Sequence, residues 1–344
     1  MKKYFISAVA ACILACSLFA CSSAEPASEE VSQENATSVS DTPAADNQAQ
    51  ESENESVAST VANTIAADEE ALVSTYESAF EQYEYTDEQT GLSVTYNLFL
   101  PASYDENASY PMVVFIADSS CTGSDASASL TQGLGALVWA AEEWQASHEC
   151  IVCVPTYPET ILDDHGSYTT TEYVELTKRL IESVSSEYAV DTDMIIGTGQ
   201  SMGCMTTLIL ASKYPDLYHA CMFVDGQWDI STLSGLENEK FIYFAAEDDS
   251  NAYAGMTEVM QMFDEDGISY SYVQWDGTWE PDQLSASAEE LYSAGAQANF
   301  VSWKTGTIDA SESNMGMGGG SAGYHMASFD YAYNCITAME WLFT

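Results

Sequence analysis

Hydrophobic and polar residues follow a regular pattern along the chain from residue 79 onward. The segments AFEQYEYTD (79–87) and LSVTYNLFLP (92–101) alternate apolar and polar residues on either side of EQTG, which predicts an antiparallel hairpin. Continuous apolar runs bounded by turn residues follow, and such runs predict strands buried on both faces of a mainly parallel sheet. These runs lie at 112–117, 150–155, 194–197, 221–226 and 241–246.

Segments with helical periodicity lie between and after these runs. They span 130–147, 170–188, 202–214, 252–266, 285–297 and 327–343, and several are closed by Gly or Pro. Strand and helix therefore alternate from residue 112 onward, without an internal repeat. The pattern predicts one doubly wound α/β sheet with an antiparallel start, over a domain that we place at 71–344.

The first 20 residues do not belong to this pattern. Two lysines precede an apolar run to Ala20, which is typical of a signal peptide and too short for a membrane span. The sequence LFAC, ending at Cys21, resembles the lipobox of bacterial lipoproteins, in which the cysteine is acylated. ILAC, ending at Cys16, fits less well because it leaves a short apolar core, and an ordinary secretory cleavage nearby is the alternative. We therefore expect an exported protein, anchored by lipid on the extracytoplasmic face of the membrane.

The segment 21–70 is poor in large apolar residues. It consists mainly of Ser, Glu, Ala, Asn, Thr and Gln, and cannot bury enough apolar surface to offset its ordering entropy. We expect a disordered acidic tether between the anchor and the domain.

The charge balance narrows the range of partners. The chain has 54 Asp and Glu against 7 Lys and Arg, a formal net charge of -47. Such a surface repels nucleic acid and anionic lipid, so we expect no nucleic-acid partner and no polyanionic substrate.

Six cysteines follow Cys21, and two of them have the spacing of a redox or zinc motif. Cys150 and Cys153 form CIVC, but they lie in an apolar run without a second cysteine pair or clustered histidines. Buried strand cysteines are the better interpretation, and no metal or cofactor is predicted. Export would permit one or two disulfides, whose pairing the sequence does not give.

The stretch MIIGTGQSMG carries the main candidate chemistry. Ser201 follows an apolar strand, precedes a predicted helix, and is flanked by Gly199 and Gly203 as G-x-S-x-G. A strand-to-helix turn this tight needs neighbours almost without side chains, and it places the hydroxyl at a helix N-terminus. We interpret Ser201 as a nucleophile rather than an ordinary turn serine.

A serine nucleophile needs a base, and the chain has four histidines. His148 and His165 precede Ser201, whereas enzymes with this turn order the residues as Ser, acid, His. His219 lies where a strand begins and is best interpreted as structural. His325 follows a glycine-rich loop and precedes the last predicted helix, so we predict it as the base.

The acid should follow a strand between the serine and the histidine. Asp249 is our choice because it lies on the loop after the apolar run 241–246, and its neighbour Asp248 is the near alternative. Asp225, at the end of CMFVDG, is a weaker alternative. The acid would fix the tautomer of His325 and stabilise its cationic form.

From about residue 80 to 344 the chain resembles bacterial α/β-hydrolase esterases of the polyhydroxybutyrate-depolymerase-like, feruloyl-esterase-like and prolyl-oligopeptidase-like groups. The stretches that carry the resemblance are YNLFLPASYDENASYPMVVFIAD, YAVDTDMIIGTGQSMGCMTTLILASKYPDLYHACMFVDGQWD and HMASFDYAYNCITAMEWLF. The resemblance implies an α/β-hydrolase fold and a triad of Ser201, Asp249 and His325.

Two positions depart from the family pattern. Where the family usually has His-Gly, this chain has Ala117 and Asp118, although the N–H groups of Ser119 and Met202 can still form an oxyanion hole. An aspartate beside an oxyanion is unfavourable unless its side chain points away. Cys204 replaces a frequent glycine, and a side chain this small fits there.

These residues predict a serine hydrolase that cleaves carboxylic esters. A peptidase of the prolyl-oligopeptidase-like type and a catalytically weak ligand-binding lipoprotein are the alternatives. We expect small-molecule or carbohydrate-linked substrates. Aromatic residues on loops near the site could stack on a substrate, but Trp and Tyr at strand ends more often serve in packing, which is the favoured interpretation. The aromatic candidates are Trp228, Trp275, Trp279 and Tyr324.

Overall fold

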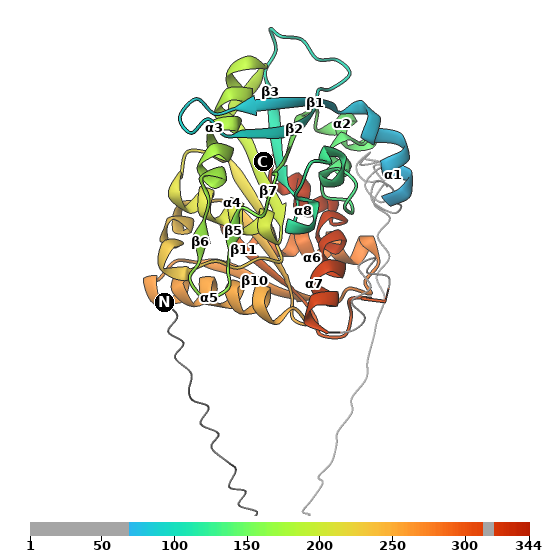
Figure 1. Cartoon of the computed structure of the whole chain (residues 1–344). Coiled ribbons are helices and arrows are strands. Elements are labelled where there is room, and N and C mark those ends of the chain that lie inside the picture. The colour runs from blue at the N-terminus through green and yellow to red at the C-terminus, as the bar shows by residue number, and fades with distance from the viewer. Residues whose placement is uncertain (1–68, 312–319) are drawn as a thin grey trace, which may run out of the picture. The chain divides into compact units, whose positions relative to one another are not determined.

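A computed structural model describes residues 69–311 and 320–344, which all lie in one compact unit of the chain (Figure 1). The predicted signal peptide, the lipidation site Cys21 and nearly all of the predicted tether lie outside the described residues. None of the helices in the described ranges is long and apolar enough to cross a membrane.

Nine strands of the described residues form one sheet, in the order β1-β2-β4-β3-β7-β8-β9-β11-β10. β1 and β2 form the predicted antiparallel hairpin, β2 pairs antiparallel with β4, and the other neighbours are parallel. This confirms the predicted α/β class. The strands are β1 (Glu81–Thr86), β2 (Ser93–Phe99), β3 (Tyr110–Ile116), β4 (Ile151–Thr156), β7 (Val190–Gln200), β8 (Ala220–Val224), β9 (Phe241–Ala246), β10 (Tyr270–Trp275) and β11 (Ala298–Trp303).

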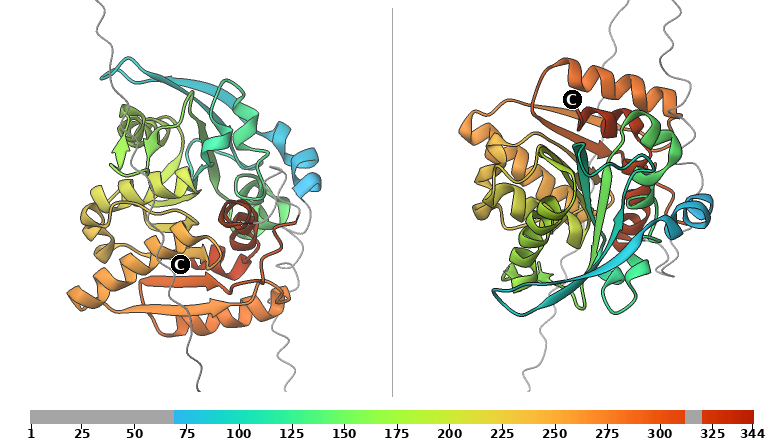
Figure 2. Two further views of the ribbon diagram at one scale, coloured as in Figure 1. Left: turned by 60° about the horizontal axis from the view of Figure 1, so that its bottom comes forward. Right: turned by 90° about the horizontal axis from the view of Figure 1, so that it is seen from above.

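Helices pack on both faces of the sheet, as the two views of Figure 2 show. One face carries α3 (Glu172–Glu187), α4 (Met202–Lys213) and α5 (Ser250–Asp266). The other face carries α1 (Glu69–Tyr76), α2 (Glu142–Ser147), α6 (Pro281–Ser293), α7 (Ser321–Tyr333) and α8 (Ile336–Trp341). Both faces of the central strands are therefore buried, which is why those strands read as continuous apolar runs.

Strands β10 and β11 were not predicted from the sequence. β10 lies at the edge of the sheet and mixes half-buried and exposed residues, so it lacks a continuous apolar run. β11 is buried throughout, but Asn299 and Ser302 interrupt its apolar pattern. Helix α6 begins at Pro281, four residues before the predicted start, because Glu280 and Gln283 form a capping box with Pro at the first helical position.

Two predicted helices are each divided in the structure. Within 130–147 only α2 is α-helical, and the preceding part contains a short 3-10 turn, Leu137–Ala140. Within 327–343 the chain forms α7 and α8, which are separated at Asn334 and Cys335. Because α7 already begins at Ser321, His325 lies in a helix and not on a loop before the last helix, which corrects the prediction.

Candidate active site

Ser201 lies in the turn that joins β7 to α4. Its φ is 52° and its ψ is -115°, a strained conformation for a residue with a side chain. A Cβ on Gly203 would come within 1.8 Å of the Ile116 carbonyl oxygen, and one on Gly199 within 2.5 Å of the Gly203 backbone. The two glycines are therefore required by close backbone approach, which places the Ser201 hydroxyl above the carboxyl end of the sheet.

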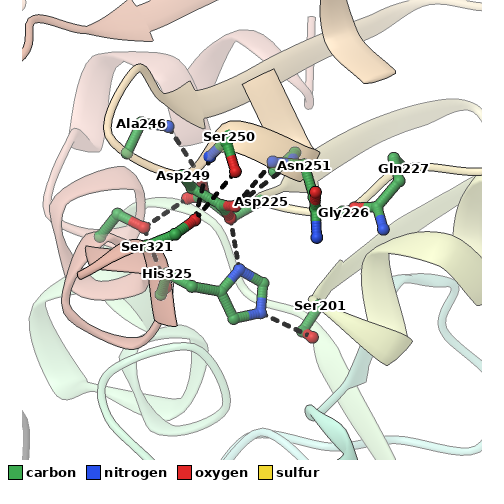
Figure 3. Close-up of polar contacts among 12 residues, drawn as sticks. Ser201, Asp225, Gly226, Gln227, Ala246, Asp249, Ser250, Asn251, Ser321 and His325 are labelled. Carbon is green, nitrogen blue, oxygen red and sulfur yellow. Dashed lines mark hydrogen bonds and ion pairs between the residues drawn. The ribbon is translucent and has the colours of Figure 1, made fainter. Parts of the chain in front are cut away.

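The structure brings Ser201, His325 and Asp249 together from three distant parts of the chain (Figure 3). Nε2 of His325 lies 2.8 Å from Oγ of Ser201, and Nδ1 lies 2.5 Å from Oδ2 of Asp249. The other Asp249 oxygen accepts from the backbone N–H groups of Asn251 and Ala252 at the start of α5. Asp249 therefore caps α5 with one oxygen and holds the imidazole with the other.

Neither alternative acid contacts the His325 ring. Asp248 accepts a hydrogen bond from the N–H of Gly306 at 2.7 Å, on a neighbouring loop. Asp225 is fully buried close to Asp249, but its Oδ1 accepts from Ala246 N–H and its Oδ2 lies 2.7 Å from Ser328 Oγ. Of the three aspartates considered from the sequence, Asp249 is the one that binds the imidazole.

The other three histidines contact residues outside this series. His219 contacts the Thr344 carbonyl through Nε2 at 3.1 Å, and His148 stacks on Trp144 with ring centroids 4.5 Å apart. His165 is exposed and forms an ion pair with Asp164, 2.8 Å from Nδ1 to Oδ1. Of the four histidines, only His325 hydrogen-bonds to Ser201 in the described structure.

The surroundings of His325 favour its protonated form. Burial alone would lower the pKa of His325, but the hydrogen bond and the charge of Asp249 outweigh burial and raise the pKa above its ordinary value. The charge of Asp118 acts in the same direction. The site therefore stabilises an imidazolium, which is the state that a general base reaches after it takes a proton.

Two residues that line the pocket beside Ser201 each begin a helical turn. Met202 is the first residue of α4, and Ser119 is the first residue of the 3-10 turn Ser119–Cys121; both line the same pocket as Ser201. The first N–H groups of a helical turn have no acceptor within that turn, so both are available to an oxyanion.

Asp118 does not direct its carboxylate at this position. Its Oδ1 accepts from both the N–H and the Oγ of Ser120, each at 2.7 Å, so the side chain caps the 3-10 turn.

Cys204 is a packing residue. It is fully buried on α4 and lies against Gly226, where an added Cβ would be 2.8 Å from its sulfur. Burial raises the pKa of its thiol well above the ordinary value, so the thiolate is disfavoured.

The other described cysteines are also free and buried, Cys150 and Cys153 among them. Cys153 lies in β4 and Cys150 immediately precedes that strand, so both are buried as predicted but only Cys153 is a strand residue. Export would permit one or two disulfides, but all six described cysteines, Cys204 included, are free in this structure.

The pocket at Ser201 has a volume of about 580 Å³. A short hairpin of β5 (Leu162–Asp163) and β6 (Thr169–Thr170) forms one wall, with Asp163, Asp164 and His165 at the pocket. Met205 and Leu162 supply apolar surface, and Gln227 donates a hydrogen bond to Asp164. The ligand atoms of Asp163, Asp164 and His165 lie close enough to hold a cation, but exposed acidic groups often cluster without one.

The four aromatic residues considered near the site are packing residues, as the favoured interpretation predicted. Trp275 is buried and donates to Ser287, Trp228 packs on Tyr168, and Trp279 and Tyr324 pack against the core. The described residues that line the pocket include no Trp, Tyr or Phe. Stacking on an aromatic acyl group is therefore not a feature of this pocket.

A pair of glutamines supports the site and was missed from the sequence. Gln132 accepts from the N–H of Asp118 and from Nε2 of Gln200, and donates to Oγ of Ser120. Gln132 thereby joins the loop at Asp118 and Ser120 to Gln200, the residue before Ser201. Gln132 lies in a segment predicted to be helical, so no sequence signal indicated this role.

Comparisons with known proteins agree with the fold. The sequence model of one family, described as "Putative esterase", matches residues 88–307. No curated protein sequence matches. A thermostable esterase of known structure is similar, with a TM-score of 0.59 and 22% identity over 77% of this chain and 63% of that chain.

Two further solved structures match with lower TM-scores. An S-formylglutathione hydrolase from Staphylococcus aureus has a TM-score of 0.48 and 12% identity over 77% of this chain and 99% of that chain. A feruloyl esterase module from Clostridium thermocellum has a TM-score of 0.48 and 13% identity over 74% and 88%. Because the family model covers well over half of the 344 residues, the chain belongs to this esterase family and has the α/β-hydrolase fold.

Proposed function

We propose that the protein is a serine esterase that hydrolyses carboxylic esters through an acyl-enzyme. Membership of the esterase family supports ester hydrolysis. The observation that carries the proposal is the unbroken contact series from Asp249 through His325 to Ser201, with distances of 2.5 and 2.8 Å. A strained serine in this series, beside two unused N–H groups, is the arrangement that acyl transfer requires.

In the proposed mechanism, Ser201 attacks the ester carbonyl while Nε2 of His325 takes the hydroxyl proton. The N–H groups of Met202 and Ser119 bind the oxyanion of the tetrahedral intermediate. Asp249 holds Nδ1–H of His325 and stabilises the imidazolium, which then protonates the leaving alcohol. A water molecule, activated by the same imidazole, releases the acid from Ser201.

Labelling with a fluorophosphonate probe tests the nucleophile, because the probe reacts with activated serines. We expect the wild type to be labelled and Ser201→Ala to be unlabelled. Hydrolysis of p-nitrophenyl butyrate should be lost in parallel, while aminoacyl-p-nitroanilides should be poor substrates of the wild type. An unlabelled wild type would instead favour the ligand-binding lipoprotein, and faster anilide cleavage would favour a peptidase.

For the N-terminus, we keep the proposal of a lipid anchor at Cys21, which the sequence LFAC supports. The enzyme would then act outside the cytoplasm on small-molecule or carbohydrate-linked esters that fit a pocket of about 580 Å³. Cys21→Ala should move the protein from the membrane fraction to the soluble fraction. An unchanged fractionation would contradict the anchor.

A further inference from the structure

Asp225 is a buried carboxyl group that has no role in the proposed mechanism. It follows β8, has a φ of 44° and is fully buried. Its Oδ1 accepts from the N–H of Ala246 at 2.8 Å, and its Oδ2 lies 2.7 Å from Oγ of Ser328. Ala246 ends the strand that leads to Asp249, and Ser328 lies one turn after His325 on α7. One side chain therefore connects the two elements that carry the acid and the base (Figure 3).

Counting hydrogen atoms shows which form of Asp225 fits these contacts. The Ser328 hydroxyl has one proton, yet two oxygens lie within reach: Oδ2 of Asp225 at 2.7 Å and the His325 carbonyl at 3.0 Å. If Asp225 were ionised, Ser328 could donate to only one of the two. If Oδ2 carries a proton, Asp225 donates to Ser328 and Ser328 donates to the His325 carbonyl. Both contacts then have a donor and an acceptor.

The charges around Asp225 act against ionisation. Asp249 and His325 face it from α5 and α7, and the buried Cys204, Tyr243 and Tyr333 are its other titratable neighbours. No Lys or Arg side chain hydrogen-bonds to Asp225 in the ranges that the structure describes. Burial and the charge of Asp249 raise the pKa of Asp225, although His325 and the hydrogen bonds from Ala246 and Ser328 oppose this shift.

We infer that Asp225 is a positioning residue that works as a neutral carboxylic acid: it donates to Ser328 and accepts from Ala246, and so fixes α7 against the end of β9. This fixes the distance between His325 and Asp249 without placing a second negative charge beside them. The inference rests on the proposed function for its effect on rate. Its structural part, a protonated Asp225, is independent of any turnover.

Asp225→Asn is the decisive variant, because asparagine copies the shape and the hydrogen bonds of the neutral acid. Its oxygen can accept from Ala246, and its amide can donate to Ser328. We expect kcat for p-nitrophenyl butyrate within about threefold of the wild type. Asp225→Ala should lower kcat by about 10²-fold with little change in KM, because the imidazole loses its fixed position.

An anionic Asp225 would give the opposite result. Asp225→Asn would then lose more than about tenfold in kcat, and the acid limb of kcat/KM would move to lower pH because His325 loses a stabilising charge. That outcome overturns the inference. If Asp225→Ala does not fold, Ser328→Ala replaces it, since it removes the donor to the His325 carbonyl and should also lower kcat.

Infrared difference spectroscopy at neutral pH tests the protonation state directly. We expect a carbonyl band of a protonated carboxylic acid in the wild type and in Ser201→Ala, and the loss of one such band in Asp225→Asn. Glu239 and Asp330 also have raised pKa values, so the difference between variants identifies the band of Asp225. An unchanged band would overturn the inference, whereas an inactive wild type with the expected band would contradict the proposed function alone.

Discussion

Three aspartates follow the neighbouring strands β8 and β9, and each makes different contacts although the side chains are identical. Asp248 and Asp249 are adjacent in the sequence, and both follow the same buried strand. Asp248 binds a loop N–H, Asp249 binds the imidazole, and Asp225 joins β9 to α7. Sequence order favoured Asp249 but could not exclude the others, because the backbone dihedrals after β9 decide which carboxylate faces His325.

The two adjacent aspartates give a matched pair of variants. We expect Asp249→Asn to lower kcat by on the order of 10⁴-fold, because it fixes the wrong tautomer and no longer stabilises the imidazolium. Asp248→Asn should stay within about threefold of the wild type, since it alters only a loop contact. Steady-state kinetics with p-nitrophenyl butyrate measures both. Equal losses in the two variants would contradict the assignment of Asp249.

The raised pKa of His325 predicts the pH dependence of the reaction. The base must be neutral to accept a proton, so kcat/KM should fall as the pH decreases through the pKa of His325. Because Asp249 stabilises the charged form, the midpoint should lie above the ordinary histidine value of about 6.5. A pH–rate profile checks this. In Asp249→Asn the midpoint of the residual activity should move below the ordinary value, and a midpoint that did not move would contradict the attribution.

At the scale of elements, the strand-turn-helix unit around Ser201 was predictable because its signals are local. A continuous apolar run predicts the buried strand β7, and G-x-S-x-G predicts the turn into α4. The sheet edge was harder: β10 is half-exposed, and polar residues interrupt β11. The break between α7 and α8 at Asn334 was also not predictable, because the helical periodicity continues across it.

The turn can be tested by adding one methyl group. Gly203→Ala should reduce the free energy of unfolding by more than about 3 kcal/mol, because its Cβ would meet the Ile116 carbonyl within 1.8 Å. Gly91→Ala is the control: its φ is 74°, but a Cβ there has open space, so it should cost about 1 kcal/mol. Urea denaturation measures both. Similar losses in the two variants would show that the close approach of Gly203 to Ile116 does not limit the turn.

At the scale of the whole molecule, negative charge dominates. The chain carries a formal net charge of -47, and Asp163 and Asp164 stand at the pocket, whereas the described residues lining it include no Lys or Arg. Clefts lined by one sign of charge concentrate ligands of the opposite sign and repel those of the same sign. We therefore expect the pocket to favour neutral or cationic esters.

Two esters of equal chain length test this selectivity. We expect p-nitrophenyl hemiglutarate to have a kcat/KM about tenfold below that of p-nitrophenyl valerate at low salt, because the pocket repels its carboxylate. The difference should shrink at high salt, which screens exposed charges. Asp164→Asn should narrow the gap at low salt. Equal values for the two esters at low salt would contradict an electrostatic selection.

The α/β class, the glycine-flanked turn at Ser201 and the choice of His325 could be predicted from the sequence, because each depends on local pattern or on the small number of candidates. Apolar runs report burial, close-packed glycines report the turn, and only one histidine follows Ser201 apart from the structural His219. The aspartate that binds His325, the direction of the Asp118 side chain, the contacts of Gln132 and the non-aromatic lining of the pocket became known only from the tertiary structure. These depend on contacts between side chains far apart in sequence, which are fixed when the strands pair and the helices pack.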